Sequence, residues 1–106
     1  MAVGVLIPMP GVERKQYEVE RKQYEDVTAE IFGHYPMKVS EIPEGMLLHT
    51  AGPNDGGWYV FDVWETIERF RSFGEEQLEP AVRAVMGTGL DHRPQIFEVE
   101  TLVQPH

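Results

Sequence analysis

The nine residues 57–65 (GWYVFDVWE) constrain the fold more than any other stretch of this chain. They combine aromatic and β-branched residues, which is the composition of a central β-strand. Successive side chains of a strand point to opposite sides. One side would carry Trp58, Val60, Asp62 and Trp64, and the other Tyr59, Phe61, Val63 and Glu65. Because both sides are largely apolar, we expect helices to cover one side and a second copy of the chain to cover the other.

Asp62 is the residue that breaks this apolar pattern. An ionised carboxylate among apolar neighbours has to be paired, hydrogen-bonded or shifted toward its neutral form. As a functional group, Asp62 would be a general base or would anchor the polar atom of a ligand. As a structural group, it would pair with an arginine across a dimer interface or with a helix residue. The sequence leaves both interpretations open.

Composition limits the classes of protein to which the chain can belong. With 106 residues, 42% of them hydrophobic, the sequence predicts one domain spanning 1–106 with a small core. It contains no cysteine, which excludes disulfides, thiolate catalysis and cysteine-ligated metals. The formal net charge of −9 argues against binding to nucleic acid or to anionic membrane surfaces. We expect the partner to be a neutral small molecule or another protein.

The hydrophobic runs of the sequence are short. None approaches the roughly 18 residues that a membrane-spanning helix needs. The first ten residues have no basic segment ahead of their apolar run, so a secretory signal is not predicted. We therefore expect a cytoplasmic protein.

Turn and helix signals divide the chain into six elements. We expect strands at 2–7, 46–51, 57–65 and 93–103, and helices at 12–32 and 66–87. Pro8 and Pro10 are expected to end the first strand, and Pro80 to break or kink the second helix. The order β-α-β-β-α-β predicts an α+β, ferredoxin-like fold, in which two helices cover one face of an antiparallel four-stranded sheet.

The first predicted helix contains an exact duplication. The heptad VERKQYE occupies 12–18 and occurs again at 19–25. Seven residues are close to two helical turns, so each residue of the second copy lies about 20° around the axis from its twin. We interpret the repeat as a coding duplication that keeps the helical face in phase. A heptad for coiled-coil pairing is the alternative, although two heptads with a poor a/d pattern do not favour it.

His49 is predicted to lie on the same face of the sheet as Asp62. The segment 52–57 predicts a hairpin between the second and third strands. If its two end glycines face each other, His49 lies opposite Val60 and Met46 falls on the other face. A histidine–aspartate pair there would orient and deprotonate a phenolic or enolic substrate, because histidine titrates near neutral pH. The alternative is a histidine that caps a strand end or bonds a backbone carbonyl, and a slip of one residue would reverse the faces.

The end of the third strand resembles a known superfamily. The segment 61–66 (FDVWET), followed by Phe70 and Phe73, is similar to the dimeric α/β-barrel superfamily and, within it, to the antibiotic-biosynthesis-monooxygenase-like branch. The resemblance implies a homodimer whose two sheets meet to form a barrel. It also implies that Trp64 lines a pocket between sheet and helices, as the matching tryptophan does in cofactor-independent monooxygenases and heme-degrading members.

Two departures from the heme-degrading members bear on cofactors. Those proteins have an asparagine on the first strand and a histidine shortly after the tryptophan. Here the first strand reads VGVLI, and Phe73, Gly74 and Glu75 offer no histidine. Without an axial ligand, heme ligation of that kind is not expected, and we predict no cofactor. The missing asparagine also weakens the monooxygenase interpretation.

The remaining candidates are assigned with their alternatives. Trp58 and Tyr24 are candidate substrate-binding residues, and the alternative for both is packing in the core. His34 and His92 lie in predicted loops and are expected to be solvated. We find no metal-binding spacing of His, Asp and Glu, no phosphate-binding glycine motif and no serine hydrolase motif.

Two classes of function follow from these observations. The first is a small cofactor-independent monooxygenase-like enzyme that acts on an aromatic or polyketide-like molecule. Asp62 and His49 would carry the acid/base chemistry, and Trp64 would form the pocket wall. The second is a non-catalytic, stress-related or ligand-binding homodimer that holds a small hydrophobic molecule or protects a partner.

Overall fold

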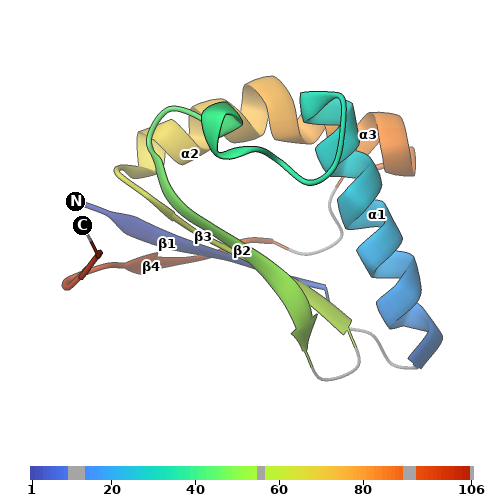
Figure 1. Ribbon diagram of the computed structural model, residues 1–106, viewed down its shortest axis with the longest axis horizontal. Coiled ribbons are helices and arrows are strands. Elements are labelled where there is room, and N and C mark those ends of the chain that lie inside the picture. Colours follow the sequence, from blue (N-terminus) through green and yellow to red (C-terminus); the bar gives the residue numbers. More distant parts are fainter. Residues whose placement is uncertain (10–13, 55–56, 90–92, 106) are drawn as a thin grey trace.

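The computed structural model describes residues 1–9, 14–54, 57–89 and 93–105. Its strands form one antiparallel sheet in the order β2-β3-β1-β4, and the helices lie against one face of it (Figure 1). The strands are β1 (Val3–Met9), β2 (Met46–Asn54), β3 (Gly57–Trp64) and β4 (Gln95–Glu98). The helices are α1 (Arg14–Phe32), α2 (Ile67–Phe73) and α3 (Glu79–Met86), with short 3-10 and π-helical turns η1 (Val39–Glu41) and η2 (Gly74–Leu78). The predicted ferredoxin-like α+β arrangement is confirmed.

The predicted central strand, β3, lies inside the sheet between β2 and β1. Its helix-facing side chains Trp58, Val60 and Trp64 are buried, and they form the hydrophobic core together with neighbours from β1, such as Val5. The strand is apolar on this side because the helices exclude water from it. Asp62 is the charged residue of the same row, and it is also buried.

The hairpin register differs from the prediction by two residues. Asn54 pairs with Gly57, which places His49 opposite Asp62 and not opposite Val60. Because strand side chains alternate with a period of two, this shift leaves His49 on the predicted face. The prediction for Met46 is wrong. An irregularity in the ladder just after this residue turns its side chain into the core, where it is buried.

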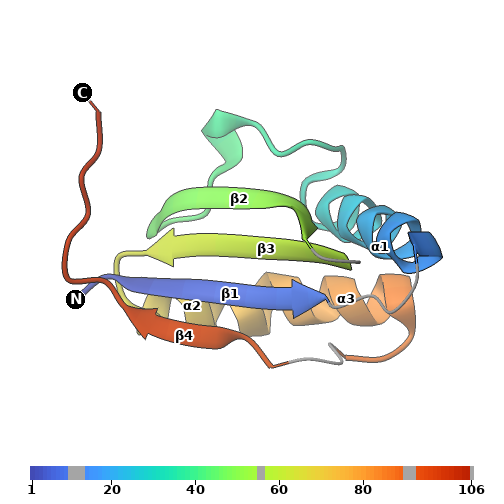
Figure 2. The same cartoon turned by 90° about the horizontal axis from the view of Figure 1, so that it is seen from below.

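The first and last strands also differ in length from the prediction. β1 does not stop before Pro8 but continues through it to Met9. The β4 ladder on β1 ends at Leu6, so Pro8 has no β4 neighbour that would require an N–H donor. β4 ends at Glu98, far short of residue 103, because its partner β1 begins at Val3 and leaves no strand to pair with further on. The residues after β4 leave the sheet as an extended tail (Figure 2). Pro10 lies outside the described residues.

Local signals explain the helix boundaries. Thr66 caps α2, since its Oγ1 accepts a hydrogen bond from the Arg69 backbone N–H. Pro80 stands in the first turn of α3, just after the π-helical turn η2, as predicted for a first-turn proline. The predicted break does not occur, because the residues at both ends of η2 keep right-handed helical dihedral angles. α1 ends at Phe32, and the next residue, Gly33, has a positive φ of 84° and donates its N–H to the Ala29 carbonyl.

The duplicated heptad lies at the start of α1. Of the first copy, only Glu18 has a described side chain, because residues 12–13 and the side chains of 14–17 lie outside the described part of the chain. In the second copy Val19 is exposed and Tyr24 is partly buried. Lys22 pairs with Asp26 one turn later. The helix therefore presents one face of the repeat to the sheet and the other to water.

The face of the sheet away from the helices remains open (Figures 1 and 2). Its residues follow the alternation of β3 and its neighbours, and they include Phe61, Val63, Leu48 and Phe97. Leu48 and Phe97 are 43% and 46% exposed. Phe61 lies over Gly4, where an added Cβ would come within 3.2 Å of the ring. An apolar sheet face of this kind is suited to cover by another protein surface.

Candidate functional site

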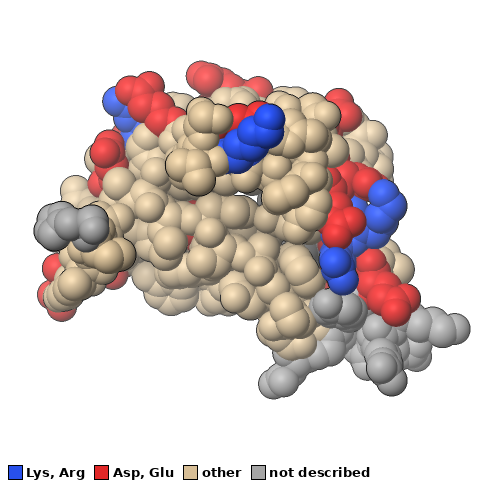
Figure 3. Space-filling view, viewed as in Figure 1, with Lys and Arg blue, Asp and Glu red and all other residues tan. Residues whose placement is uncertain are grey.

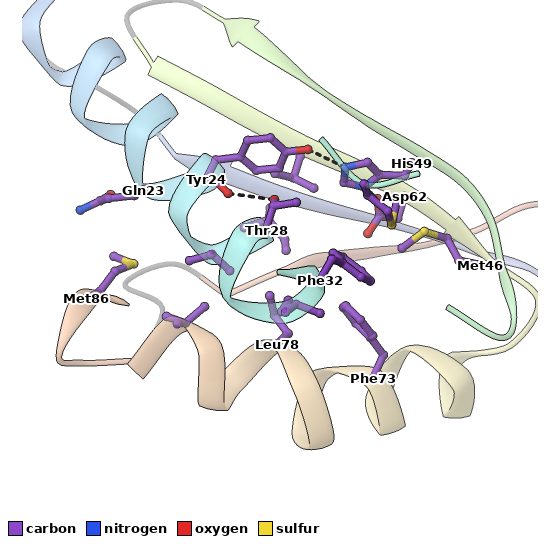
Figure 4. Close-up of a pocket in the computed structure, with 16 residues that line it drawn as sticks. Gln23, Tyr24, Thr28, Phe32, Met46, His49, Asp62, Phe73, Leu78 and Met86 are labelled. Carbon is purple, nitrogen blue, oxygen red and sulfur yellow. Dashed lines mark hydrogen bonds and ion pairs between the residues drawn. The ribbon is translucent and has the colours of Figure 1, made fainter. Parts of the chain in front are cut away.

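A chain of hydrogen bonds links Asp62, His49 and Tyr24 between the sheet and the helices (Figure 4). The Nδ1 atom of His49 lies 2.6 Å from Oδ1 of Asp62. The Nε2 atom of the same ring lies 2.7 Å from the hydroxyl oxygen of Tyr24. Three residues that the sequence nominated as site residues are thus in direct contact.

Regular secondary structure positions all three side chains. His49 and Asp62 are directly paired residues of β2 and β3 and point to the helix side of the sheet. Tyr24 comes from α1, and its ring lies nearly parallel to that of His49, with centroids 6.0 Å apart and planes 11° apart. The Tyr24 ring also contacts Trp58 at 5.7 Å and Tyr35 at 5.8 Å. The aromatic contacts fix the direction in which the Tyr24 hydroxyl points.

Burial sets the protonation state of Tyr24. Loss of solvent around the hydroxyl raises the pKa of Tyr24 to about 12. The hydroxyl therefore keeps its hydrogen at neutral pH and donates it to a hydrogen-bond acceptor.

The buried carboxylate determines which histidine nitrogen carries hydrogen. A carboxylate only accepts hydrogen bonds, so the hydrogen between Asp62 and His49 is on Nδ1. Nε2 of a neutral His49 then has a free electron pair, and the Tyr24 O–H donates to it. The direction of both bonds runs from the tyrosine through the histidine to the aspartate. Such a chain can move a proton from Tyr24 to the ring while the carboxylate stabilises the resulting imidazolium.

These groups stand at one end of a cavity between the sheet and the helices (Figure 4). Its volume is about 90 Å³. One water needs roughly 10–15 Å³ on this scale, so several waters or a small organic molecule fit. The α1 wall consists of Gln23, Tyr24, Val27, Thr28, Ile31 and Phe32. The rest of the wall includes Met37, Met46, Phe73, Leu78, Val82 and Met86.

The wall is apolar apart from the end with the hydrogen-bond chain. Among the described residues that line it, none is a lysine or an arginine. The charged side chains that are visible on the surface follow the helices and the ends of the sheet, and the flank between them is uncharged (Figure 3). The cavity therefore suits an uncharged molecule that is largely apolar.

The two tryptophans stand behind this cavity rather than on its wall. Trp64 is fully buried and packs against Phe70 and Phe73, with ring centroids 5.8 Å and 5.4 Å away. Phe73 lines the cavity and Trp64 does not. Trp58 supports the Tyr24 ring from behind in the same way. Phe73, which packs on Trp64, thus takes the position on the cavity wall that was predicted for Trp64.

Several wall residues were not nominated by the sequence. Thr28, Ile31 and Phe32 follow Tyr24 at helical spacing, so extending the inward stripe of α1 would have found them. Met37 lies in the loop after α1 and carried no periodic signal. Its place follows from the path of that loop over the cavity.

The other predicted histidines do not join the site. His34 is not simply solvated, since its Nε2 lies 2.8 Å from Oε2 of Glu41. This contact with the ring lowers the pKa of the Glu41 carboxyl. His92 lies outside the described residues. Within the part of the chain that the structure describes, no three His, Asp or Glu side chains are grouped to hold a metal ion.

Histidine ligation of a heme does not fit the described residues of the cavity. Among the described wall residues, His49 is the one histidine, and both of its ring nitrogens are engaged by Asp62 and Tyr24. It therefore offers no free axial ligand. As for membranes, none of the helices in the described ranges is long and apolar enough to cross one.

Solved structures of known proteins share this fold. A heme-degrading protein of Mycobacterium tuberculosis matches with a TM-score of 0.57 and 16% identity, over 98% of this chain and 100% of that one. A monooxygenase of Streptomyces coelicolor, solved with the ligand nanaomycin D, matches with a TM-score of 0.55 and 18% identity, over 99% and 91%. SnoaB, a cofactor-independent oxygenase of Streptomyces nogalater, matches with a TM-score of 0.56 and 12% identity, over 98% and 97%. No protein-family model and no curated protein matches the sequence.

The chain therefore has the ferredoxin-like fold of the antibiotic-biosynthesis-monooxygenase-like proteins, the group that the FDVWET segment suggested. The resemblance is confirmed at the level of the fold. Oxygenases and a heme-degrading protein share it at low identity, so the fold does not fix the activity.

Proposed function

We propose that this protein is a cofactor-independent acid/base enzyme that removes a proton from a small, uncharged, weakly acidic molecule such as a phenol or an enol. The observation that carries the proposal is the chain from Tyr24 through His49 to Asp62 at the end of an apolar cavity. Its groups have the types and distances that proton transfer requires, about 2.6–3.2 Å between heavy atoms.

The roles follow from the positions in the chain. His49 is the base, and Asp62 holds its tautomer and stabilises the positive charge that develops on the ring. The apolar wall excludes water, which strengthens this electrostatic stabilisation. Trp58 and Trp64, from the layer behind, hold the wall in shape.

The reaction that we propose after deprotonation uses dioxygen. A phenolate or enolate is electron-rich enough to reduce dioxygen without a cofactor. In a monooxygenation at a methylene next to the enol, one oxygen atom becomes the new carbonyl oxygen. The second oxygen leaves as water with the two methylene hydrogens, so dioxygen is the oxidant and the carbon is oxidised. The fold shared with a cofactor-independent oxygenase supports this choice of reaction.

A non-catalytic binding protein is the second candidate. Tyr24, His49 and Asp62 are hydrogen-bonded to one another, and most of the cavity wall is apolar. A protein that only stores or protects a hydrophobic molecule needs no more than this. In that case the hydrogen-bond chain would have a structural role.

We propose further that the working form is a homodimer. The open face of the sheet presents Leu48 and Phe97, each more than two-fifths exposed. A second copy of the chain that packs its own open face against this one would cover both sets of residues, as in a barrel of two sheets.

Replacing Asp62 tests the enzymatic proposal. Asp62→Asn keeps the shape of the side chain but cannot stabilise an imidazolium, so turnover should fall by about 100-fold or more. Oxygen consumption and product formation over a panel of phenols and enols would measure turnover, and ligand titration would measure affinity. Asp26→Asn, on the exposed side of α1, is the matched control. Unchanged turnover in Asp62→Asn would contradict the proposed role of Asp62. If the wild type binds members of the panel but turns none of them over, the binding protein is favoured.

A further inference from the structure

We propose that Tyr24, and not His49, is the catalytic residue that touches the ligand, and that the cavity recognises uncharged molecules through a hydrogen that they donate. Hydroxyl, enol and amine groups would bind, and ketones and ethers of the same shape would be disfavoured. This inference rests on the proposed acid/base site and names the class of molecule that the site takes.

His49 has no nitrogen left for a ligand. Its Nδ1 is held by Asp62 at 2.6 Å and its Nε2 by Tyr24 at 2.7 Å. A ligand that reached Nε2 would have to displace the Tyr24 hydroxyl, which is fixed by the ring contacts with Trp58 and Tyr35. The Tyr24 oxygen and the Asp62 carboxylate therefore remain for a molecule in the cavity, and Tyr24 is the one whose hydroxyl leads to Nε2 of His49.

The hydrogens of the polar wall atoms are already committed. The Tyr24 hydroxyl donates its hydrogen to His49 and can still accept a hydrogen bond on its oxygen. Thr28 donates its hydroxyl hydrogen to the Tyr24 carbonyl at 2.9 Å. Asp62, as a carboxylate, has no hydrogen to give, and Figure 4 shows it pointing from the sheet toward the helices.

Gln23, the remaining polar residue of the wall, adds no hydrogen-bond donor to the cavity. Gln23 carries an amide with two donors, but Figure 4 shows its amide directed away from the cavity. The described lining also lacks lysine and arginine. The polar end of the cavity thus presents hydrogen-bond acceptors, and a ligand that only accepts would leave its own polar atom unpaired there, at a cost in binding.

Proton transfer through Tyr24 conserves atoms and charge. The ligand gives its hydroxyl hydrogen to the Tyr24 oxygen, and Tyr24 gives its own hydrogen to Nε2 of His49. The ligand becomes an anion and His49 a cation beside the Asp62 carboxylate. The Tyr24 O–H then points to the ligand and donates to the new anion, so the same residue that accepts from the substrate stabilises the product.

Three probes of similar shape test the selectivity. Calorimetry would compare 4-ethylphenol, which donates, with acetophenone, which only accepts, and with ethylbenzene, which does neither. We expect 4-ethylphenol to bind the wild type about 2- to 12-fold more tightly than acetophenone, the value of one hydrogen bond. Equal binding of the two, or no saturable binding of 4-ethylphenol, would overturn the inference.

A pair of matched variants assigns the selectivity to Tyr24. Tyr24→Phe removes the hydroxyl and keeps the ring, and it should abolish the preference for 4-ethylphenol. Tyr35→Phe removes the same atom from the residue that contacts the Tyr24 ring, and it should keep the preference. Equal loss in both variants, or loss in neither, would contradict the role of Tyr24. Circular dichroism would verify that both variants fold.

The absorbance of bound 4-nitrophenol separates this inference from the proposed function. At a pH well below the pKa of free 4-nitrophenol, the unbound probe is neutral. Transfer of its proton through Tyr24 then produces nitrophenolate, which absorbs at longer wavelength than the neutral form. Nitrophenolate in the wild type and neutral nitrophenol in Tyr24→Phe would support both proposals. A neutral spectrum in the wild type, together with the preference for 4-ethylphenol, would keep the selectivity and contradict the deprotonation.

Discussion

His49 and Asp62 are opposite residues of two neighbouring strands, and their side chains meet with Nδ1 and Oδ1 2.6 Å apart. The backbone ladder between β2 and β3 fixes the distance between their Cα atoms. The pair is therefore held by regular structure rather than by a loop. A site built on strands keeps its geometry within the narrow limits that proton transfer needs.

Removal of the His49 ring should destabilise the protein. His49→Leu leaves the buried Asp62 carboxylate without its ring N–H donor, and we expect the free energy of unfolding to fall by about 1–3 kcal/mol. The double variant His49→Leu/Asp62→Leu removes both partners and should recover part of this loss. Urea denaturation at one protein concentration would measure both. A single variant as stable as the wild type would show that the contact contributes nothing to folding.

The raised pKa of Tyr24 predicts a loss of stability at high pH. The folded protein holds this proton up to a pKa of about 12, whereas an unfolded tyrosine releases it near 10. Between these values the unfolded state binds fewer protons, so stability is full below pH 10 and falls as the pH rises through the window. Unfolding midpoints at pH 9 and 11 should differ less in Tyr24→Phe than in the wild type. An equal difference in both proteins would contradict the assignment.

A charge on the open sheet face should separate the proposed dimer. Phe97→Asp places a carboxylate where we expect the second copy to pack, and it should weaken dimerisation at least about tenfold. Analytical ultracentrifugation would give the mass of each form. Val39→Asp, in the exposed turn η1, is the control and should leave the mass unchanged. A monomeric wild type would rule out the dimer.

Deletion of one heptad should leave the fold intact. Removing residues 12–18 rotates the rest of α1 by about 20°, so Tyr24 still faces the sheet. We expect the same far-UV circular dichroism and the same oligomeric mass as the wild type. Deletion of the six residues 12–17 is the control, because it rotates the helix by about 120° and should disrupt packing. Loss of folding in the seven-residue deletion would show that the extra turns contribute to the core.

The contact between His49 and Asp62 was partly predictable. The alternation of strand residues predicts both side chains on one face. This prediction survives a register error of two residues, because side chains alternate with a period of two. The predicted register is wrong, because the prediction places Gly52, Pro53 and Asn54 in the turn, whereas they belong to β2. Turn signals mark where a chain can bend, but residues of these types also continue a strand, as 52–54 do here.

The cavity was much less predictable than the sheet. Its walls combine α1, β2, β3 and the second helical segment, so its shape depends on how distant elements pack. Met46 lies on the face of the sheet opposite to the predicted one, because the ladder is irregular just after it. No residue type in the sequence indicates this irregularity. Trp64 was expected on the wall by resemblance, but Phe73 stands in front of it. Sequence patterns identify the face of a side chain, and the depth at which it lies depends on the elements that pack over it.

The π-helical turn η2 changes the direction in which the side chains of α3 point relative to those of α2. Phe73 and Val82 are nine residues apart, which on a regular helix places them about 180° from each other around the axis. Both nevertheless line the cavity, because the turn at Gly74–Leu78 takes up one extra residue and rotates α3 by about 100° relative to α2. The five-residue step from Phe73 to Leu78 in the apolar spacing is the trace of this rotation in the sequence. A deletion of one residue within η2 would therefore turn Val82 away from the ligand, although the chain would be a more regular helix.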